Sequence, residues 1–230
     1  MEFSVKVKLF RILLVITALA IIFFATKYAF ANLSYLKVDS YLTRWQKTKV
    51  VDKLEMQDAL TSVDSMLSLH GHFPHYLNVA AKVYEWRAFT HGDDQATYES
   101  YLLTAFGYYL KSSQLRSHWP LTWAFMANIK SNLNQLDDDF YYYIDQSIKY
   151  GPYTHEVNLQ IAKLQLLYWG RLDKLPIKVG LEQIKRALLN NNSVYLLLDY
   201  ANAIDRSAIV CTVARLNKIE RVVRHKSCKP

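Results

Sequence analysis

Apolar side chains recur through most of this chain at alternating spacings of four and three residues. That spacing places them on one face of an α-helix, because a helix turns by about 100° per residue. No comparable stretch alternates with a period of two, as a half-buried strand would. The sequence therefore predicts an all-α fold. The stripes are Met56, Leu60, Val63 and Leu67; Leu77, Ala81, Tyr84 and Ala88; Tyr98, Leu102, Ala105 and Tyr109; Thr122, Met126, Ile129 and Leu133; Val157, Ile161, Leu164 and Tyr168; and Ile177, Leu181, Ile184 and Leu188.

Turn residues separate these stripes and set the length of each helix pair. The segment from Trp119-Pro120 to Gly151-Pro152 is close to the tetratricopeptide (TPR) length of about 34 residues. Short turns of this kind join antiparallel neighbours. We therefore predict a degenerate TPR-like array of about three to four helix pairs over residues 34–230, an architecture that presents a concave surface to partners.

The N-terminal segment is apolar over Ile12–Thr26, and apolar residues extend it on both sides. A transmembrane helix needs about 20 apolar residues to cross about 30 Å of hydrocarbon. Arg11 and Lys27 lie near the two ends, where long basic side chains reach the headgroups. A single span is therefore physically possible.

The same segment also has the features of a cleaved signal peptide. Lys6, Lys8 and Arg11 form a basic start, and Ala29-Phe30-Ala31 fits the small-x-small cleavage rule. Against cleavage, a helical seam continues through that point, and no Gly or Pro precedes Gly71. The residues of this seam are Tyr28, Ala31, Tyr35, Val38, Leu42 and Trp45.

We therefore expect residues 1–33 to be an uncut signal anchor, with cleavage after Ala31 as the alternative. The expected topology has a cytoplasmic N-terminus, one span and a periplasmic repeat domain. Basic residues from Lys27 to Lys49 count against exporting that side, whereas the short N-terminal tail favours it.

Charge and motifs narrow the function further. The net charge is +8, but residues 206–230 alone hold seven Lys or Arg against one acid, so the body is nearly neutral. A broad nucleic-acid-binding face is not indicated. Within that tail, Ile209 to Arg224 resembles one basic amphipathic helix, which suits an anionic surface or solvent.

Common nucleophile, phosphate-binding and zinc-protease motifs are absent, so we predict no catalytic residues and no cofactor.

Three histidines form the sharpest candidate for a metal site. His70, His72 and His75 lie within six residues, a density that suits Zn²⁺. The other interpretation is a turn between helices, in which Pro74 begins the second helix. No carboxylate or Cys lies beside them, which favours the turn.

Aromatic residues are unusually frequent, with 17 Tyr, 10 Phe and 5 Trp. Consecutive helical residues point about 100° apart, so Tyr141, Tyr142 and Tyr143 cannot all face one core. With Trp119 and Trp123, they are candidates for contact with a sugar or a protein partner. The alternative is that these large rings fill gaps between helices.

The two cysteines, Cys211 and Cys228, are compatible with one disulfide in an oxidising compartment, or with two free thiols in the cytosol.

Short motifs along the chain resemble the VpsP-like proteins of bacterial exopolysaccharide biosynthesis loci. They are Glu85-Trp86-Arg87, Trp119-Pro120 with Trp123-Ala124, and Gly151-Pro152-Tyr153, and the resemblance covers about Leu9 to Asn190. It implies an inner-membrane accessory protein for making or exporting an extracellular polysaccharide, and it implies no catalytic residue.

Three functional hypotheses follow. The first is a non-enzymatic, membrane-anchored adaptor that binds protein components of a polysaccharide assembly machinery. The second is a periplasmic carbohydrate-binding module, and the third is a metal hydrolase that uses the histidine turn.

Overall fold

The structure is a computed structural model that describes residues 2–228, with side chains from residue 10 onward. The described residues are helical and contain no strand, which confirms the predicted all-α class. Lys6 and Lys8, the basic residues expected at the start of the anchor, lie outside the residues whose side chains are described. The chain divides into two compact units, Met1–Tyr108 and Tyr109–Pro230.

The first unit is built on a long N-terminal helix, α1 (Glu2–Thr48), followed by α2 (Lys53–His70) and α3 (Pro74–Phe89). Helix α4 (Gln95–Leu115) begins in this unit and continues into the second. Each start has a local cause. The Asp52 carboxylate accepts hydrogen bonds from the first free amides of α2, and Pro74 occupies the first turn of α3, where its missing N–H costs nothing.

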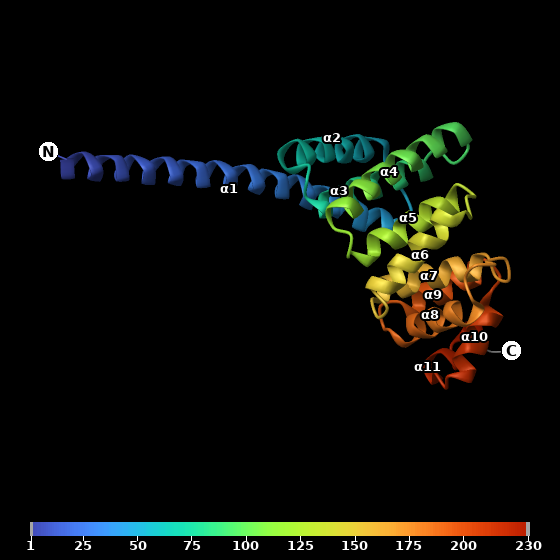
Figure 1. The fold of residues 1–230 in the computed structure, drawn as a ribbon. Helices are drawn as coiled ribbons and strands as arrows, with labels where there is room; N and C mark the ends of the chain where they lie inside the picture. The colour runs from blue at the N-terminus through green and yellow to red at the C-terminus, as the bar shows by residue number, and fades with distance from the viewer. Residues whose placement is uncertain (1, 229–230) are drawn as a thin grey trace. The chain divides into compact units, whose positions relative to one another are not determined.

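Helix α2 runs antiparallel to the second half of α1, and α3 runs in the same direction as α1 (Figure 1). The Trp45 ring packs edge-on against Trp86, 6.1 Å between centroids, near the end of α1. Ala31, Val38 and Trp45 have no exposed surface, so the predicted seam forms the α1 face of this core from Ala31 onward, whereas Tyr28, at 44% exposed, lies outside the core. The remaining core residues of the unit are Leu42, Met56, Ala59, Val63, Met66, Tyr76, Val79, Ala80 and Val83.

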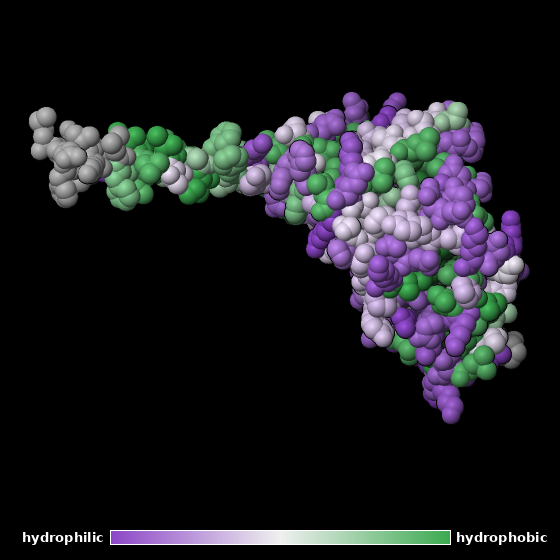
Figure 2. Space-filling model, in the orientation of Figure 1, coloured by the Kyte–Doolittle hydropathy of each residue, from purple (hydrophilic) through white to green (hydrophobic). Residues whose placement is uncertain are grey.

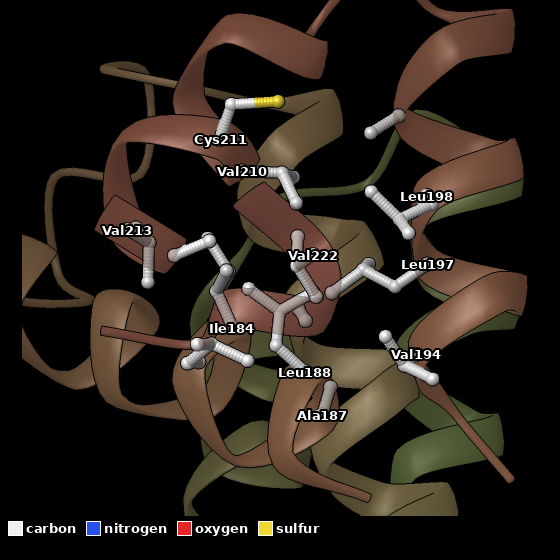
Figure 3. Packing of buried hydrophobic residues seen from close by; sticks show 14 of the residues in the cluster. Ile184, Ala187, Leu188, Val194, Leu197, Leu198, Val210, Cys211, Val213 and Val222 are labelled. Atoms are coloured by element: carbon white, nitrogen blue, oxygen red, sulfur yellow. The ribbon is translucent and has the colours of Figure 1, made fainter. Parts of the chain in front are cut away.

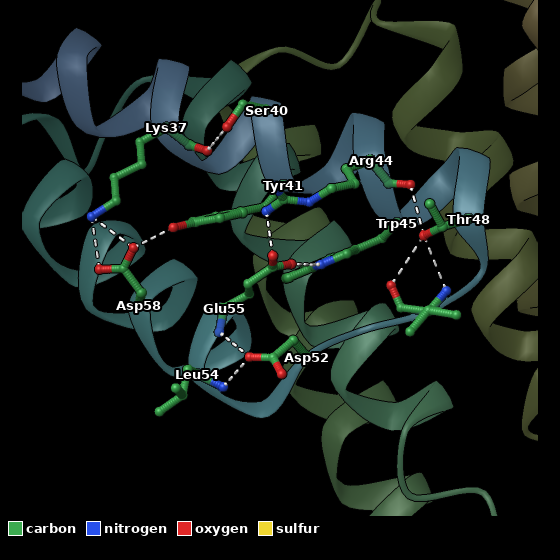
Figure 4. A network of polar contacts seen from close by, with 11 residues as sticks. Lys37, Ser40, Tyr41, Arg44, Trp45, Thr48, Asp52, Leu54, Glu55 and Asp58 are labelled. Atoms are coloured by element: carbon green, nitrogen blue, oxygen red, sulfur yellow. Dashed lines mark hydrogen bonds and ion pairs between the residues drawn. The ribbon is translucent and has the colours of Figure 1, made fainter.

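A row of polar contacts fixes the register between α1 and α2 (Figure 4). The Asp58 carboxylate accepts hydrogen bonds from Lys37 Nζ at 2.7 Å and from Tyr41 OH at 2.5 Å. One turn away, Glu55 accepts from Trp45 Nε1 at 3.0 Å. These partners lie at the rim of the buried seam, so their chief effect is to select one alignment of the two helices.

The second unit contains α5 (Pro120–Asn132), α6 (Asp138–Tyr150), α7 (His155–Leu167), α8 (Ile177–Leu189), α9 (Val194–Ala203), α10 (Ser207–Leu216) and α11 (Glu220–Val223), with a short 3₁₀ turn at Lys226–Cys228. Helix α6 starts where the Asp137 carboxylate accepts a hydrogen bond from the Phe140 amide at 3.1 Å. The core of α7–α11 is aliphatic, and Ile184, Leu197 and Val222 meet in its centre (Figure 3).

The predicted stripes agree with the buried faces of the helices, with one exception. Ile177 is 51% exposed, because it is the first residue of α8 and lies beyond the packed part of that helix. The single basic helix expected from Ile209 to Arg224 is wrong. Helix α10 ends at Leu216, and Lys218 takes a left-handed backbone conformation (φ 54°) that turns the chain before α11 begins.

Candidate functional surfaces

The first half of α1 is apolar, and its described side chains do not pack into the core of the first unit. Within the described residues it is the one helix long and apolar enough to cross a membrane, and none of its apolar window is buried (Figure 2). From Phe10 to Phe30 the helix covers about 30 Å at 1.5 Å per residue, the thickness of a bilayer's hydrocarbon. Phe23, in the middle, is 64% exposed.

The two threonine hydroxyls in this segment form hydrogen bonds within the helix itself. Thr17 Oγ1 donates to the Leu13 carbonyl at 2.9 Å, and Thr26 Oγ1 donates to the Ile22 carbonyl at 2.7 Å. An unpaired hydroxyl would be costly in lipid, because nothing there can accept its hydrogen bond. Both hydroxyls can therefore enter a bilayer with their hydrogen bonds made.

The helix does not break at the possible cleavage site. Ala29, Phe30 and Ala31 are all helical, and Ala31 is already part of the core of the first unit. The exposed apolar surface and the buried seam thus belong to one continuous element.

A cavity of about 440 Å³ opens in the first unit, beside the loop between α1 and α2. Its apolar lining comes from Val51, Met56 and Leu60, and its polar lining includes Lys53 and Arg87. Further lining comes from Asp52, Gln57, Thr90 and His91. An apolar floor with a largely cationic rim can take an apolar side chain that is flanked by acidic groups.

Two contacts hold the rim of this cavity in place. The Arg87 guanidinium lies over the Tyr101 ring, 4.3 Å from its centroid, and His91 Nδ1 lies 2.9 Å from the Arg87 carbonyl oxygen. The rim is therefore positioned by α3 and α4 before any partner arrives. Sequence reasoning missed this cavity, because its lining comes from two separate segments, residues 51–60 and 87–91, and carries no motif.

Three of the five aromatic candidates are buried in the second unit. Trp123 is 8% exposed, stacks on Tyr143 with 5.9 Å between centroids, and donates from Nε1 to the Ser117 carbonyl at 2.7 Å. Tyr141 is buried as well, and its hydroxyl donates to Asp173 at 2.6 Å. Burial raises the pKa of both Tyr141 and Tyr143. Trp123 on α5 and Tyr143 on α6 thus pack against each other, and Tyr141 faces the loop between α7 and α8. Burial excludes all three rings as candidates for stacking on a sugar.

The other two candidates are accessible. Tyr142 is 50% exposed and meets Trp123 edge-on, and Trp119 is 36% exposed at the start of α5. The Arg116 guanidinium lies 3.7 Å from the centroid of the Trp119 ring. In the turn between α6 and α7, Tyr153 is 82% exposed under the guanidinium of Arg186, 4.7 Å away. Both Trp119 and Tyr153 are thus exposed rings that pair with a cation.

The histidine turn packs against aromatic rings. The His70 ring lies 4.4 Å from Tyr28 and 5.1 Å from Phe73, centroid to centroid, and His75 lies 5.0 Å from Tyr35. Burial lowers the pKa of His70, and the neighbouring charges of Lys27 and His72 lower it further. Among the residues with described side chains, no three His, Cys, Asp or Glu gather as metal ligands would.

Cys211 and Cys228 are joined in a disulfide with 5.3 Å between Cα atoms. Both side chains lie in the aliphatic core of the second unit, so the bond ties the 3₁₀ turn to α10.

Comparison with known proteins supports the fold. No protein-family model matches this chain, and no curated protein matches it. Among solved structures, it is similar to the crystal structure of a thermophilic TPR protein of Thermus thermophilus. The TM-score is 0.53 at 15% identity, over 79% of this chain and 98% of that chain.

That likeness shows the fold alone. The protein is an all-α chain in which a long apolar N-terminal helix leads into a degenerate TPR-like array of helix pairs, as the spacing of the stripes predicted.

Proposed function

We propose that this protein is a non-enzymatic adaptor, anchored in the bacterial inner membrane by α1, that presents its TPR-like domain to protein partners of an extracellular polysaccharide assembly machinery. The observation that carries the proposal is the continuity of α1. One uninterrupted helix supplies a bare apolar half of bilayer length and, from Ala31 onward, the central seam of a folded core.

The anchor is uncut in this proposal, for a structural reason. A peptidase needs extended backbone at its cleavage site, whereas Ala29 and Ala31 lie within the helix, and Ala31 has no exposed surface. Unwinding this turn would also remove Ala31 from the core. We expect the N-terminus to face the cytoplasm and the TPR-like domain to face the periplasm, where disulfides such as Cys211–Cys228 persist.

The link to polysaccharide rests on the resemblance to VpsP-like proteins. Two of the resembling motifs meet in the structure, since a Cβ atom at Gly151 would lie 2.5 Å from Pro120 Cβ. This close approach requires glycine at residue 151. The polymer and the partner proteins are left to experiment.

A truncation tests the anchor and the function together. Deleting residues 1–29 removes the bare half of α1 and keeps Ala31 with the rest of the seam. In a strain that lacks the native gene, we expect this variant to stay helical by circular dichroism yet fail to restore exopolysaccharide. The control restores the tether by fusing an unrelated single-span anchor to residue 30. Full activity from the untethered domain, or a mature chain that begins at Asn32, would contradict the proposal.

The cavity on the first unit is the proposed partner site. Lys53→Glu reverses a charge on its rim, and Thr61→Glu adds the same charge to an exposed position of α2 outside the cavity. Neither side chain is buried, so both variants should fold like the parent. We expect exopolysaccharide yield to fall with Lys53→Glu and to stay at the parent level with Thr61→Glu; equal yields would remove the cavity from the proposal.

A second candidate function, carbohydrate binding, is supported by the exposed Trp119 ring and its Arg116 partner. The cell's own polysaccharide should then quench tryptophan fluorescence, and Trp119→Phe should remove most of that quenching. Trp123→Phe, which changes a buried ring, serves as the control. A flat titration of the parent protein would reject this candidate.

A further inference from the structure

The antiparallel course of α2 brings its C-terminal end back to the point where the apolar half of α1 ends. Contacts along the pair follow in order: Trp45 with Glu55 at one end, then Ser34 with Ser65. The last contact is between the rings of Tyr28 and His70. The turn between α2 and α3 therefore lies level with Tyr28 on α1.

Tyr28 lies at the expected boundary of the hydrocarbon. If about 30 Å of hydrocarbon begins near Phe10, it ends near Phe30, and a headgroup layer of about 5–7 Å follows. A shift of the span by one helical turn moves this boundary by only about 5 Å. With the boundary near Phe30, Tyr28 lies about 3 Å inside it, and with the span shifted by one turn toward the N-terminus, Tyr28 lies at the inner edge of the headgroup layer. In both of these registers Tyr28 and the turn beside it lie within about 3 Å of the surface where hydrocarbon meets headgroups.

The chemistry of the turn suits that layer. Phe73 is 38% exposed at its tip and stacks against His70, and His72 is exposed beside it. Residues 65–76 contain no Asp or Glu, and Lys27 adds a cation at the same level of α1. Aromatic and basic side chains are the types enriched where membrane proteins meet headgroups, because they combine an apolar body with a polar or charged end.

The opposite end of the same helices has a different character. There the rim of α1 and α2 carries Asp52, Glu55 and Asp58, with Glu55 ion-paired to Arg44 and Asp58 to Lys37 (Figure 4). The last turn of α2 and the turn after it carry no Asp or Glu. The C-terminal end of α2 therefore has no carboxylate that phospholipid headgroups of negative charge would repel.

We infer that the α2–α3 turn, residues 70–75, rests in the phospholipid headgroup layer and gives the first unit a second point of attachment to the membrane beside α1. This inference depends on the proposed membrane anchoring. The turn acts as a stop: it fixes how far α1 enters the bilayer and which side of the first unit faces the lipid.

Spin labels at single introduced cysteines test the inference in the full-length protein. The native cysteines are held in the disulfide, so labelling without reductant leaves them unmodified. The protein is reconstituted in vesicles of phosphatidylethanolamine and phosphatidylglycerol and labelled at His72→Cys, Gln57→Cys or Leu19→Cys. Collision rates with oxygen, which concentrates in lipid, and with a neutral nickel chelate, which stays in water, report the depth of each label.

We expect the ratio of oxygen to nickel collisions to be highest at residue 19, several-fold lower but clearly raised at residue 72, and at the aqueous value at residue 57. Adding Phe73→Ser should return the label at residue 72 toward the aqueous value. The matched control is Phe89→Ser, which removes an exposed ring from the other end of α3 and should leave residue 72 unchanged.

The outcomes separate the two proposals. An aqueous ratio at residue 72 together with a lipid ratio at residue 19 overturns the headgroup contact and leaves the anchor intact. Aqueous ratios at both residues overturn the anchor and, with it, the contact. A raised ratio at residue 72 that neither serine variant changes would also overturn the inference, because it would assign no part to Phe73.

Discussion

The disulfide between Cys211 and Cys228 closes a loop around the last helices of the second unit, and its reduction gives a quantitative test of how that unit is held together. The two cysteines are 17 residues apart. In the chain-entropy treatment, closing a loop of that length removes enough disorder from the unfolded chain to stabilise the fold by about 3 kcal/mol at 25 °C.

Reduction isolates this contribution, because the thiols stay in place. Cys211 and Cys228 are both buried in the core of α7–α11, so the apolar contacts of their sulfur atoms persist after the bond is broken. The expected loss of about 3 kcal/mol corresponds to a roughly hundredfold higher population of the open second unit, since each 1.4 kcal/mol is a factor of about ten.

Hydrogen exchange measured by mass spectrometry reads this population directly. Amides of α8 and α9 in the second unit should lose roughly a hundredfold of protection in reductant, if they exchange through global opening of that unit. Amides of α2 and α3 in the first unit should change little. The double variant Cys211→Ala and Cys228→Ala is the control, because reductant should not alter its exchange.

Equal protection of α8 and α9 in the oxidised and reduced protein would refute this reasoning. It would mean that the aliphatic core alone holds the 3₁₀ turn and that the bond removes little entropy from the unfolded chain. A loss of protection would add weight to the proposed periplasmic location, because a cytosolic copy would lack the bond.

Three further predictions concern single residues. Trp45→Ala removes a fully buried ring from the first unit and should lower its free energy of unfolding by about 3–5 kcal/mol in a denaturant titration, with Trp45→Phe losing less. Gly151→Ala places a methyl group within 2.6 Å of Pro120 side-chain atoms and should cost about 1–3 kcal/mol, seen as a lower Tm of the second unit; an unchanged Tm would show that the turn relaxes freely. Asp58 has a pKa lowered by hydrogen bonds from Lys37 and Tyr41, so its contribution to stability is present above its unfolded pKa of about 3.9 and is lost as the pH falls through the lowered value. Asp58→Asn should therefore unfold at a lower denaturant concentration than the parent at pH 6, and the difference should shrink in acid; a difference that is independent of pH would contradict the assignment.

The helices and their buried faces could be predicted from the sequence because helical periodicity is a local property. Val63 on α2, Ile161 on α7 and Ile184 on α8 are buried where their stripes predicted. The seam on α1 was predictable for the same reason, since Val38 and Trp45 continue one spacing across the possible cleavage site.

The aromatic surface could not be predicted in the same way. Successive rings on α6 point in different directions, and the sequence does not say which direction faces α5. The structure buries Tyr143 against Trp123 on α5, buries Tyr141 beside Asp173 in the loop between α7 and α8, and leaves Tyr142 half exposed. The break at Lys218 was missed for a related reason: a left-handed residue other than glycine leaves little trace in apolar spacing.

Because α1 is continuous, it fixes the rotation of the first unit about the membrane normal. Without a glycine or proline in the helix, each residue inserted between Phe30 and Ala31 would rotate the first unit by about 100° relative to the span and raise it by about 1.5 Å. A one-residue insertion would thus turn the cavity toward a different membrane neighbour, whereas a seven-residue insertion would nearly restore its direction about 10 Å farther from the bilayer. In this chain, the number of residues in α1 therefore sets the direction in which the cavity faces around the membrane normal.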